Sequence, residues 1–316
     1  MLRVIELIKN NKNWRDILSG APYGLRIVDD GDFSILKFTY SDSDFNNEIV
    51  RECRGLIIDN KKLEPVCIPF FKFFNYGEEY AEKIDWDSAV VEEKIDGALI
   101  KVWNYGNEWM ISTNNSIYAD KVFLHSETMT NIDSDVKNMG ELFRNALKEI
   151  NFSFESLNPQ CTYIFELVSP YNKLVIAYET TDVYHIGTRD NIIGHEIEVD
   201  IGIKKPKVYK CNNVNDLIDM ASKLKSCEEG YVVRDKNFKR VKVKSPAYVA
   251  FKHFIHDMND ERIINILRSN EDSELLTYFP EFRKQFDEMA LKIENIDSNI
   301  SKSLSDKEML KYVNMF

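Results

Sequence analysis

The sequence is poor in the residues that mark several common functional sites. It has 5 cysteines and 5 histidines among 316 residues, with no CxxC pair and no HExxH spacing, so neither of these zinc patterns is present. The odd number of cysteines without such spacing predicts reduced thiols, no disulfides and a cytoplasmic location. A phosphate-binding GxxxxGK[ST] loop and a GxSxG elbow are also missing, which excludes P-loop enzymes and serine hydrolases with that elbow.

Long hydrophobic runs and an excess of positive charge are missing as well. No apolar run approaches the roughly 20 residues of a membrane span, and the segment Met1–Leu7 acquires charge too early for a secretory signal. Lysine and arginine number 41 against 52 aspartate and glutamate, a net charge of −11. A nucleic acid would therefore have to meet a local basic surface. Since 44% of the residues are apolar, the chain can still bury a sizeable core.

Hydrophobic periodicity divides the chain into a mixed body and a helical tail. Helical spacing predicts one or two short helices within residues 1–18, and further helices near 139–150 and 217–224. Short alternating runs predict strands at 55–59, 89–94, 98–103, 108–113, 162–168, 173–178, 183–189, 193–199, 230–234 and 240–244. Beyond residue 247 the pattern is only helical, around 263–267 and 282–293. We therefore predict an α+β body of antiparallel sheets with flanking helices over residues 1–250 and a small all-helical domain over 251–316.

Four short segments hold the residues that can carry chemistry. In chain order they are Lys94-Ile95-Asp96-Gly97, Phe165-Glu166-Leu167-Val168, Glu229-Gly230-Tyr231-Val232 and Lys242-Val243-Lys244. They supply an amine, two carboxylates and two further cations. This set of groups can transfer AMP from ATP onto a lysine, so the sequence predicts an adenylating enzyme.

The three lysines admit a functional and a simpler interpretation. A lysine attacks only when part of it is neutral near pH 7, and neighbouring cations favour the neutral form. Lys242 and Lys244 could supply those cations to Lys94 if their strand lies beside its strand. On a strand the two share one face because Val243 points the other way, so an anion such as a polyphosphate would relieve their repulsion. Alternatively, Lys94 is a solvated lysine before an Asp-Gly turn, and the other two belong to an exposed basic strand.

The two glutamates are also open to two interpretations. Glu166 lies in an apolar strand, where a carboxylate needs a cation, a metal or a hydroxyl; a structural ion pair would serve equally. Glu229 precedes Gly230, which permits a ligand to approach the backbone, although the segment also fits a simple turn. Mg²⁺ needs only one or two carboxylates besides substrate phosphates, so two separated glutamates suffice.

Taken together, the segments resemble the covalent nucleotidyltransferases, which comprise polynucleotide ligases and mRNA capping enzymes. Lys94-Ile95-Asp96-Gly97 matches their nucleotide-attachment motif, and the other three segments match later motifs in order. Within this superfamily the sequence is most similar to the bacteriophage RNA ligase 1 family, over about residues 33–250. That similarity includes Glu52-Cys53-Arg54-Gly55, Lys72-Phe73-Phe74-Asn75, Ser169-Pro170, Asn172, Ser245 and Tyr248.

The resemblance implies a nucleotidyltransferase fold and an ATP-dependent RNA ligase that uses ATP and Mg²⁺. Lys94 would attack the α-phosphorus and form lysyl-AMP; AMP would pass to an RNA 5′-phosphate, and a 3′-hydroxyl would displace it. The resemblance also assigns roles to further residues: nucleotide binding to Arg54, Lys72 and Glu166, metal support to Glu229, adenine contact to Val232, and phosphate neutralisation to Lys242 and Lys244. We expect single-stranded or tRNA-like RNA ends as partners, a monomer, and the host cytoplasm if a phage encodes the chain.

Two departures from the family pattern leave alternatives open. Thr113-Asn114-Asn115 stands where the phage family often has a basic residue, so a phosphate contact at Asn114 is replaced or lost. The helical tail is shorter than the phage family's C-terminal domain, which leaves tRNA specificity open. A ligase for DNA or nicked duplexes and a non-catalytic RNA-end-binding protein are the alternatives. Residues 251–316 show no alternation typical of the OB barrel that DNA ligases append, which favours an RNA ligase.

Overall fold

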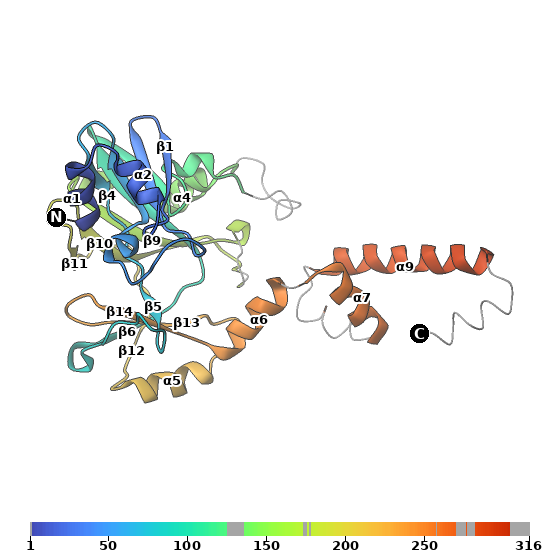
Figure 1. Cartoon of the computed structure of the whole chain (residues 1–316). Helices are drawn as coiled ribbons and strands as arrows, with labels where there is room; N and C mark the ends of the chain where they lie inside the picture. Colours follow the sequence, from blue (N-terminus) through green and yellow to red (C-terminus); the bar gives the residue numbers. More distant parts are fainter. Residues whose placement is uncertain are drawn as a thin grey trace. The chain divides into compact units, whose positions relative to one another are not determined.

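The computed structural model describes residues 2–124, 136–172, 176, 178–256, 258–269, 276 and 282–303. The chain forms two compact units, Met1–Ala250 and Phe251–Phe316. The first contains three sheets with helices around them (Figure 1). Their strand pairs are antiparallel except for one parallel pair in the third sheet. All five cysteines are free thiols. Within the described residues no helix has both the length and the apolar character that a membrane span requires.

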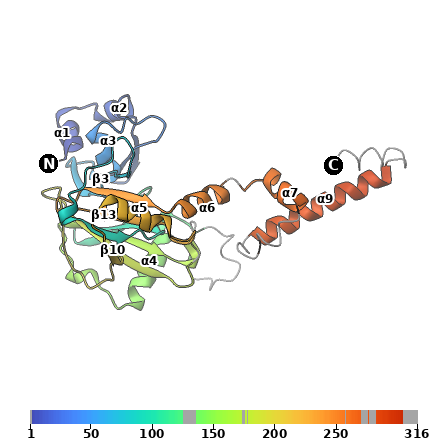
Figure 2. The ribbon, with the colours of Figure 1, turned by 90° about the horizontal axis from the view of Figure 1, so that it is seen from below.

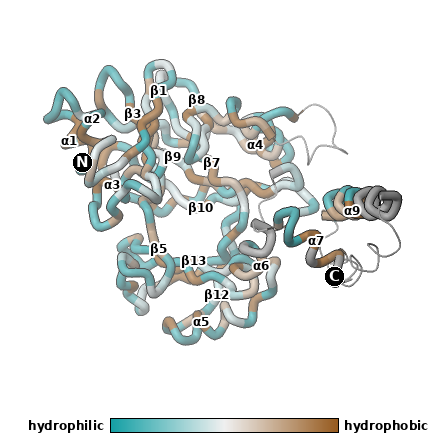
Figure 3. The backbone as a smooth tube through the Cα atoms, turned by 45° about the vertical axis from the view of Figure 1, so that its right-hand side comes forward, coloured by the Kyte–Doolittle hydropathy of each residue, from teal (hydrophilic) through white to brown (hydrophobic). Residues whose placement is uncertain are grey.

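The N-terminal part of the first unit is a four-stranded sheet in the order β1-β2-β3-β4. Its strands are Arg26–Asp30, Phe33–Lys37, Arg54–Asp59 and Glu64–Cys67. Leu56, Ile57 and Ile58 are all buried because β3 is covered on both faces, and β3 is correspondingly hydrophobic in Figure 3. Leu56 and Ile58 pack against helices α1 (Arg3–Asn10), α2 (Trp14–Ser19) and α3 (Glu48–Glu52), which group around β3 in Figure 2.

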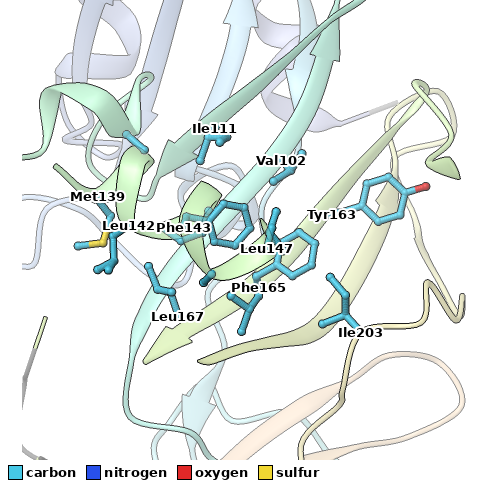
Figure 4. Packing of buried hydrophobic residues seen from close by; sticks show 14 of the residues in the cluster. Val102, Ile111, Met139, Leu142, Phe143, Leu147, Tyr163, Phe165, Leu167 and Ile203 are labelled. Atoms are coloured by element: carbon cyan, nitrogen blue, oxygen red, sulfur yellow. The ribbon is translucent and has the colours of Figure 1, made fainter. Parts of the chain in front are cut away.

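The second sheet has five strands in the order β11-β10-β9-β7-β8. These span Glu196–Ile197, Asp182–Asp190, Cys161–Val168, Ala98–Tyr105 and Glu108–Thr113. One face packs on helix α4 (Met139–Glu149), and Figure 4 shows Phe143 and Leu147 of that helix against Phe165 of β9. Because side chains alternate along a strand, Glu166 points away from this core, to the opposite face.

The third sheet has five strands in the order β12-β6-β13-β14-β5. They span Val208–Tyr209, Val90–Glu93, Gly230–Arg234, Arg240–Lys244 and Phe74–Asn75. Helix α5 (Val214–Ser222) lies beside this sheet (Figure 1). The sheet face toward it is apolar, and Leu217 of α5 belongs to one buried cluster with Val91, Val233 and Val241. Side chains alternate along a strand, so Val232, Lys242 and Lys244 lie on the opposite face of the sheet.

The second unit is helical in its described part. Helix α6 (Pro246–His256) runs across the boundary between the units, and α7 (Asp260–Ser269) and α9 (Arg283–Ser303) follow. Ile263 of α7 and Phe286 and Met289 of α9 belong to one buried apolar cluster.

Most predicted elements form, with four differences. The segment before β3 contains helix α3, which was not predicted; the Asn47 side chain accepts the Ile49 N–H and caps this helical turn. The predicted strand 193–199 is reduced to Glu196–Ile197. The predicted strand 173–178 lies mostly outside the described residues, and its described positions, 176 and 178, are not in a strand. The prediction of antiparallel sheets fails for one pair of strands, because β5 pairs with β14 in parallel.

Candidate active site

Lys94 and Lys244 meet at one buried carboxylate, that of Glu229. Lys94 Nζ donates to Glu229 Oε2 at 2.6 Å, and Lys244 Nζ lies 3.1 Å from Glu229 Oε1. The Glu229 side chain is only 4% exposed, whereas the lysines are 22% and 24% exposed. A buried carboxylate requires such partners, while each ammonium group remains accessible to a ligand.

The sheet order explains how these groups converge. From sequence, Lys242 and Lys244 could reach Lys94 if their strand lay beside its strand; instead β13 lies between β6 and β14 and pairs with both. Glu229 immediately precedes β13, so it stands between the two lysines. The Lys94 N–H donates to the Gly230 carbonyl at 2.9 Å, which extends the ladder and fixes Lys94 next to Glu229.

Two glycines allow this close approach. Gly230 has φ +141°, and a Cβ there would lie 2.2 Å from the Val243 carbonyl oxygen. A Cβ on Gly97 would lie 2.5 Å from the Leu167 carbonyl oxygen. A side chain at Gly230 would therefore push β13 away from β14, and one at Gly97 would push the Lys94 segment away from β9.

Glu166 lies on β9 and faces the same group of charges. Gly97 N donates to Glu166 Oε1 at 3.2 Å. Burial raises the pKa of Glu166 to about 7, with Glu229 adding to the rise and Lys94, the Gly97 N–H and Arg54 opposing it. Part of this carboxyl is therefore protonated at neutral pH, so it can donate as well as accept a hydrogen bond.

Lys242 and Arg54 both lie close to the Phe73 ring. Lys242 Nζ and Arg54 Cζ are each 5.5 Å from the ring centroid. Burial, together with the charges of Lys72, Arg54, Lys244 and Lys94, lowers the pKa of Lys242 to about 7. Burial also lowers the pKa of Arg54, which the negative charge of Glu166 opposes. Such a concentration of cations calls for a polyanion.

Lys72 is surrounded by aromatic rings. Its Nζ lies 5.0–5.7 Å from the ring centroids of four residues: Phe38, Tyr40, Phe45 and Phe74. The Tyr40 hydroxyl is 3.3 Å from Nζ. These contacts hold the ammonium group in place without neutralising its charge.

Val232 is the remaining predicted site residue, and it pairs with Lys242 on β14 and Glu92 on β6. Directly opposed residues of antiparallel strands share a face, so the Val232 side chain is on the charged face of the sheet. Lys94 also lines a cavity of about 100 Å³, together with Glu229, Tyr178, Tyr209 and Tyr231. All eight residues predicted from sequence thus lie around one region of the first unit.

The structure adds contacts that the sequence did not indicate. Asp96 accepts from the Tyr248 hydroxyl at 2.9 Å, which joins the segment Lys94–Gly97 to α6, and from Ile176 N at 3.0 Å. Tyr248 had been noticed only as part of the resemblance. The Asn114 side-chain oxygen is buried without a hydrogen-bond partner, and Lys37 Nζ donates to the Asn115 carbonyl at 3.1 Å. A cation from β2 therefore reaches the loop that lacks the family's basic residue.

Sequence comparison assigns the family. Residues 52–248, more than half of the chain, match the phage-type RNA ligase 1 family, which is described as RNA ligase. This chain belongs to that family. The matched range begins just before Arg54 and ends at Tyr248, so it contains all eight predicted site residues.

Individual relatives agree with the family. The RNA ligase of Rhodothermus phage RM378 is 25% identical over 283 residues, covering 69% of this chain and 64% of that ligase. A protein of Autographa californica nuclear polyhedrosis virus, whose name proposes both polynucleotide kinase and RNA ligase functions, is 27% identical over 298 residues. That match covers 90% of this chain but 42% of the viral protein. The chain thus spans about half the length of these relatives.

A solved structure supports the fold. An archaeal ATP-dependent RNA ligase (form 2) superposes with a TM-score of 0.51 at 13% identity, covering 84% of this chain and 77% of that one. At this identity the similarity concerns the α+β nucleotidyltransferase fold alone.

Proposed function

We propose that this chain is an ATP-dependent RNA ligase that joins 5′-phosphate and 3′-hydroxyl RNA ends through a lysyl-AMP intermediate. The observation that supports this most directly is the convergence of Lys94 and Lys244 on Glu229, with Lys242 on the same sheet face. The family to which the chain belongs is described as RNA ligase. The same proposal has the protein act as a monomer in the cytoplasm of a host cell.

In the first step Lys94 Nζ would attack the α-phosphorus of ATP. A nitrogen–phosphorus bond forms, the bond to pyrophosphate breaks and the amine loses a proton. Lys242, Lys244, Arg54 and Lys72 supply cations for the charge on the phosphates, which is the main work in phosphoryl-type transfers. Glu166 contacts the nucleotide, and its partly protonated carboxyl can bond a ribose hydroxyl in either direction.

The site has carboxylates that fit a divalent cation. Among the described residues no group of three or more His, Cys, Asp or Glu side chains could hold a metal alone. Mg²⁺ commonly takes one or two carboxylates and completes its shell with phosphate oxygens and water. Glu229 fits this role, with Glu166 near it. Bound there, Mg²⁺ would neutralise charge on the phosphates.

In the later steps AMP would pass from Lys94 to an RNA 5′-phosphate, and the 3′-hydroxyl of another end would displace AMP. The first two steps develop charge on the phosphorus of the AMP group, and the last develops it on the RNA 5′-phosphorus to which AMP is joined, so cations around the joined phosphates would serve all three. RNA ends are therefore the proposed substrates.

A strand-joining assay tests the proposal. The full chain, with ATP and Mg²⁺, is offered 5′-phosphorylated single-stranded RNA, single-stranded DNA and a nicked DNA duplex in parallel, with Lys94→Ala as control. We expect joining of RNA by the parent protein and none by the variant. Preferential sealing of the DNA nick would favour a DNA ligase, and RNA binding without joining of any substrate would favour a non-catalytic RNA-end-binding protein.

A further inference from the structure

A second cavity, of about 250 Å³, lies next to the proposed nucleotide site. Its lining is aromatic and charged and includes Phe70, Phe71, Phe238, Arg189, Lys239 and Arg240; we call it the aromatic–arginine cavity. Lys72 and Phe73 also line it. Since the Phe73 ring contacts Arg54 and Lys242, the cavity adjoins the nucleotide site across this one segment.

Two arginines of this cavity are held by aromatic rings. Arg189 Cζ lies 4.0 Å from the Phe71 centroid, and Arg240 Cζ lies 4.4 Å from the Phe70 centroid. Each arginine is only 6% exposed. Stacking on a ring fixes a guanidinium plane, so these cations need little rearrangement to receive a ligand.

The two arginines differ in what satisfies them. Arg240 is paired with Glu196, but no ion pair to Arg189 is found in the part of the chain that the structure describes. Arg189 Nη2 donates to the Gly194 carbonyl at 2.6 Å, while its Nε is buried without a hydrogen-bond partner. Glu196 lies opposite Arg189 in the sheet and partly compensates its charge, but burial still lowers the pKa of Arg189 to about 10, and an anionic ligand would relieve this cost of burying the guanidinium.

The turn that carries Phe238 and Lys239 is also unusual. Phe238 has φ +59°, a left-handed conformation that a bulky residue rarely adopts. This conformation places an aromatic ring and an exposed lysine in succession along the cavity lining. Strained backbone of this kind often occurs at binding sites. Aromatic rings beside cations form the usual platform for single-stranded nucleic acid, since the bases stack and the phosphates are neutralised.

We propose that the aromatic–arginine cavity binds one phosphate-bearing nucleotide of the RNA strand whose end reaches Lys94. Arg189 and Lys239 would meet the phosphate, and Phe238 would stack on the base. The proposal rests on the proposed function for the identity of the strand. The phosphates of ATP or pyrophosphate share the same chemistry, so the experiment must separate the two sources.

The test compares Lys239→Glu and Phe238→Ala with Lys12→Glu, an exposed charge reversal that lies outside this cavity. Three quantities are measured on the full chain: the rate of Lys94 labelling by ATP without RNA, the RNA concentration for half-maximal single-turnover joining by pre-adenylylated protein, and the binding of a fluorescent 5′-phosphorylated RNA oligonucleotide by anisotropy. We expect both cavity variants to label at the parent rate but to need roughly tenfold more RNA in the joining and binding assays. Lys12→Glu should match the parent in all three.

Two results would overturn the proposal. Slower labelling by ATP with unchanged RNA dependence would show that the cavity serves the phosphates of ATP. Unchanged behaviour of both cavity variants would show that it is no ligand site. If the parent protein failed to label, the proposed function would fail, and the anisotropy comparison would still decide whether the cavity binds RNA.

Discussion

Strand β14 has a buried carboxylate near each end, and the two carboxylates are satisfied in different ways. Near the end of the strand, Glu229 is shared by Lys244 and Lys94, whose side chains are 24% and 22% exposed. At the start, Glu196 is paired with Arg240, which is only 7% exposed, and Arg240 Nη1 donates to Glu196 Oε2 at 2.5 Å. The second guanidinium nitrogen also bonds Glu196, so this pair is bidentate.

The difference shows how one strand can combine structure with chemistry. A buried, bidentate arginine–carboxylate pair holds the two strands in one arrangement, because the guanidinium stays charged and its planar fork matches a carboxylate. Lysine ammonium groups make single contacts, can lose a proton and can exchange a carboxylate for a phosphate. The Arg240–Glu196 pair joins β14 to β11 of the neighbouring sheet, whereas the Glu229 pairs leave cations available to a substrate.

The largest expected effect comes from replacing, one at a time, the two lysines that contact Glu229 by arginine. Lys94→Arg keeps a cation beside Glu229 but removes the attacking amine, so labelling by ATP should fall by at least ~10³-fold. Lys244→Arg keeps the only property that the proposal requires of that residue, its charge, and should label within about tenfold of the parent. The rate of covalent AMP incorporation measures both. Labelling of Lys94→Arg at a rate near the parent's would remove Lys94 as the nucleophile.

A change at each end of β14 should separate stability from activity. Arg240→Met leaves the buried Glu196 carboxylate uncompensated and should lower the free energy of unfolding by about 3–5 kcal/mol. Lys244→Met removes a partly exposed cation and should cost about 1 kcal/mol or less, while it slows labelling. Denaturant titration measures the free energy of unfolding. An equal loss of stability in the two variants would contradict the division of roles.

These two ends also show what sequence can and cannot predict. Alternation predicted β8, β13 and β14 with the bounds that the structure has, because each strand has one apolar face. The motifs predicted which residues gather at the site. Neither predicted that Arg240 pairs with Glu196, 44 residues away. Spacing within a segment carries no information on which strands become neighbours.

The position of β13 between β6 and β14 could not be predicted for the same reason. The partners of Glu52 could not be predicted either. This buried carboxylate accepts the N–H groups of Arg3 and Val4 at the start of α1, a contact formed only in the folded chain. The cavity beside Phe73 combines residues from five separate stretches of the chain, which lie together only in the folded protein. Such sites are formed by contacts between residues far apart in the sequence, and local sequence patterns do not indicate those contacts.

A smaller effect is expected from the titration of Lys242. Its pKa of about 7 in the free protein means that the ammonium form is mostly lost at pH 8 and present at pH 6. Phosphates bound beside it favour the charged form, so ATP binding should take up about one proton at pH 8 and few at pH 6. Apparent ATP affinity should accordingly fall as pH rises above 7.

Calorimetry of a non-reactive ATP analogue in buffers of different ionisation enthalpy measures this uptake. Lys242→Met should abolish it, whereas Lys12→Glu should leave it unchanged. Proton uptake of the same size in Lys242→Met would assign the titration to another group.

The central claim, that Lys94 becomes covalently joined to AMP, is tested most directly by mass spectrometry of the full chain after incubation with ATP and Mg²⁺. We predict one added adenylyl group, located by peptide mapping on Lys94 and absent from Lys94→Arg. An unmodified protein, or an adenylyl group on another residue, would contradict the account.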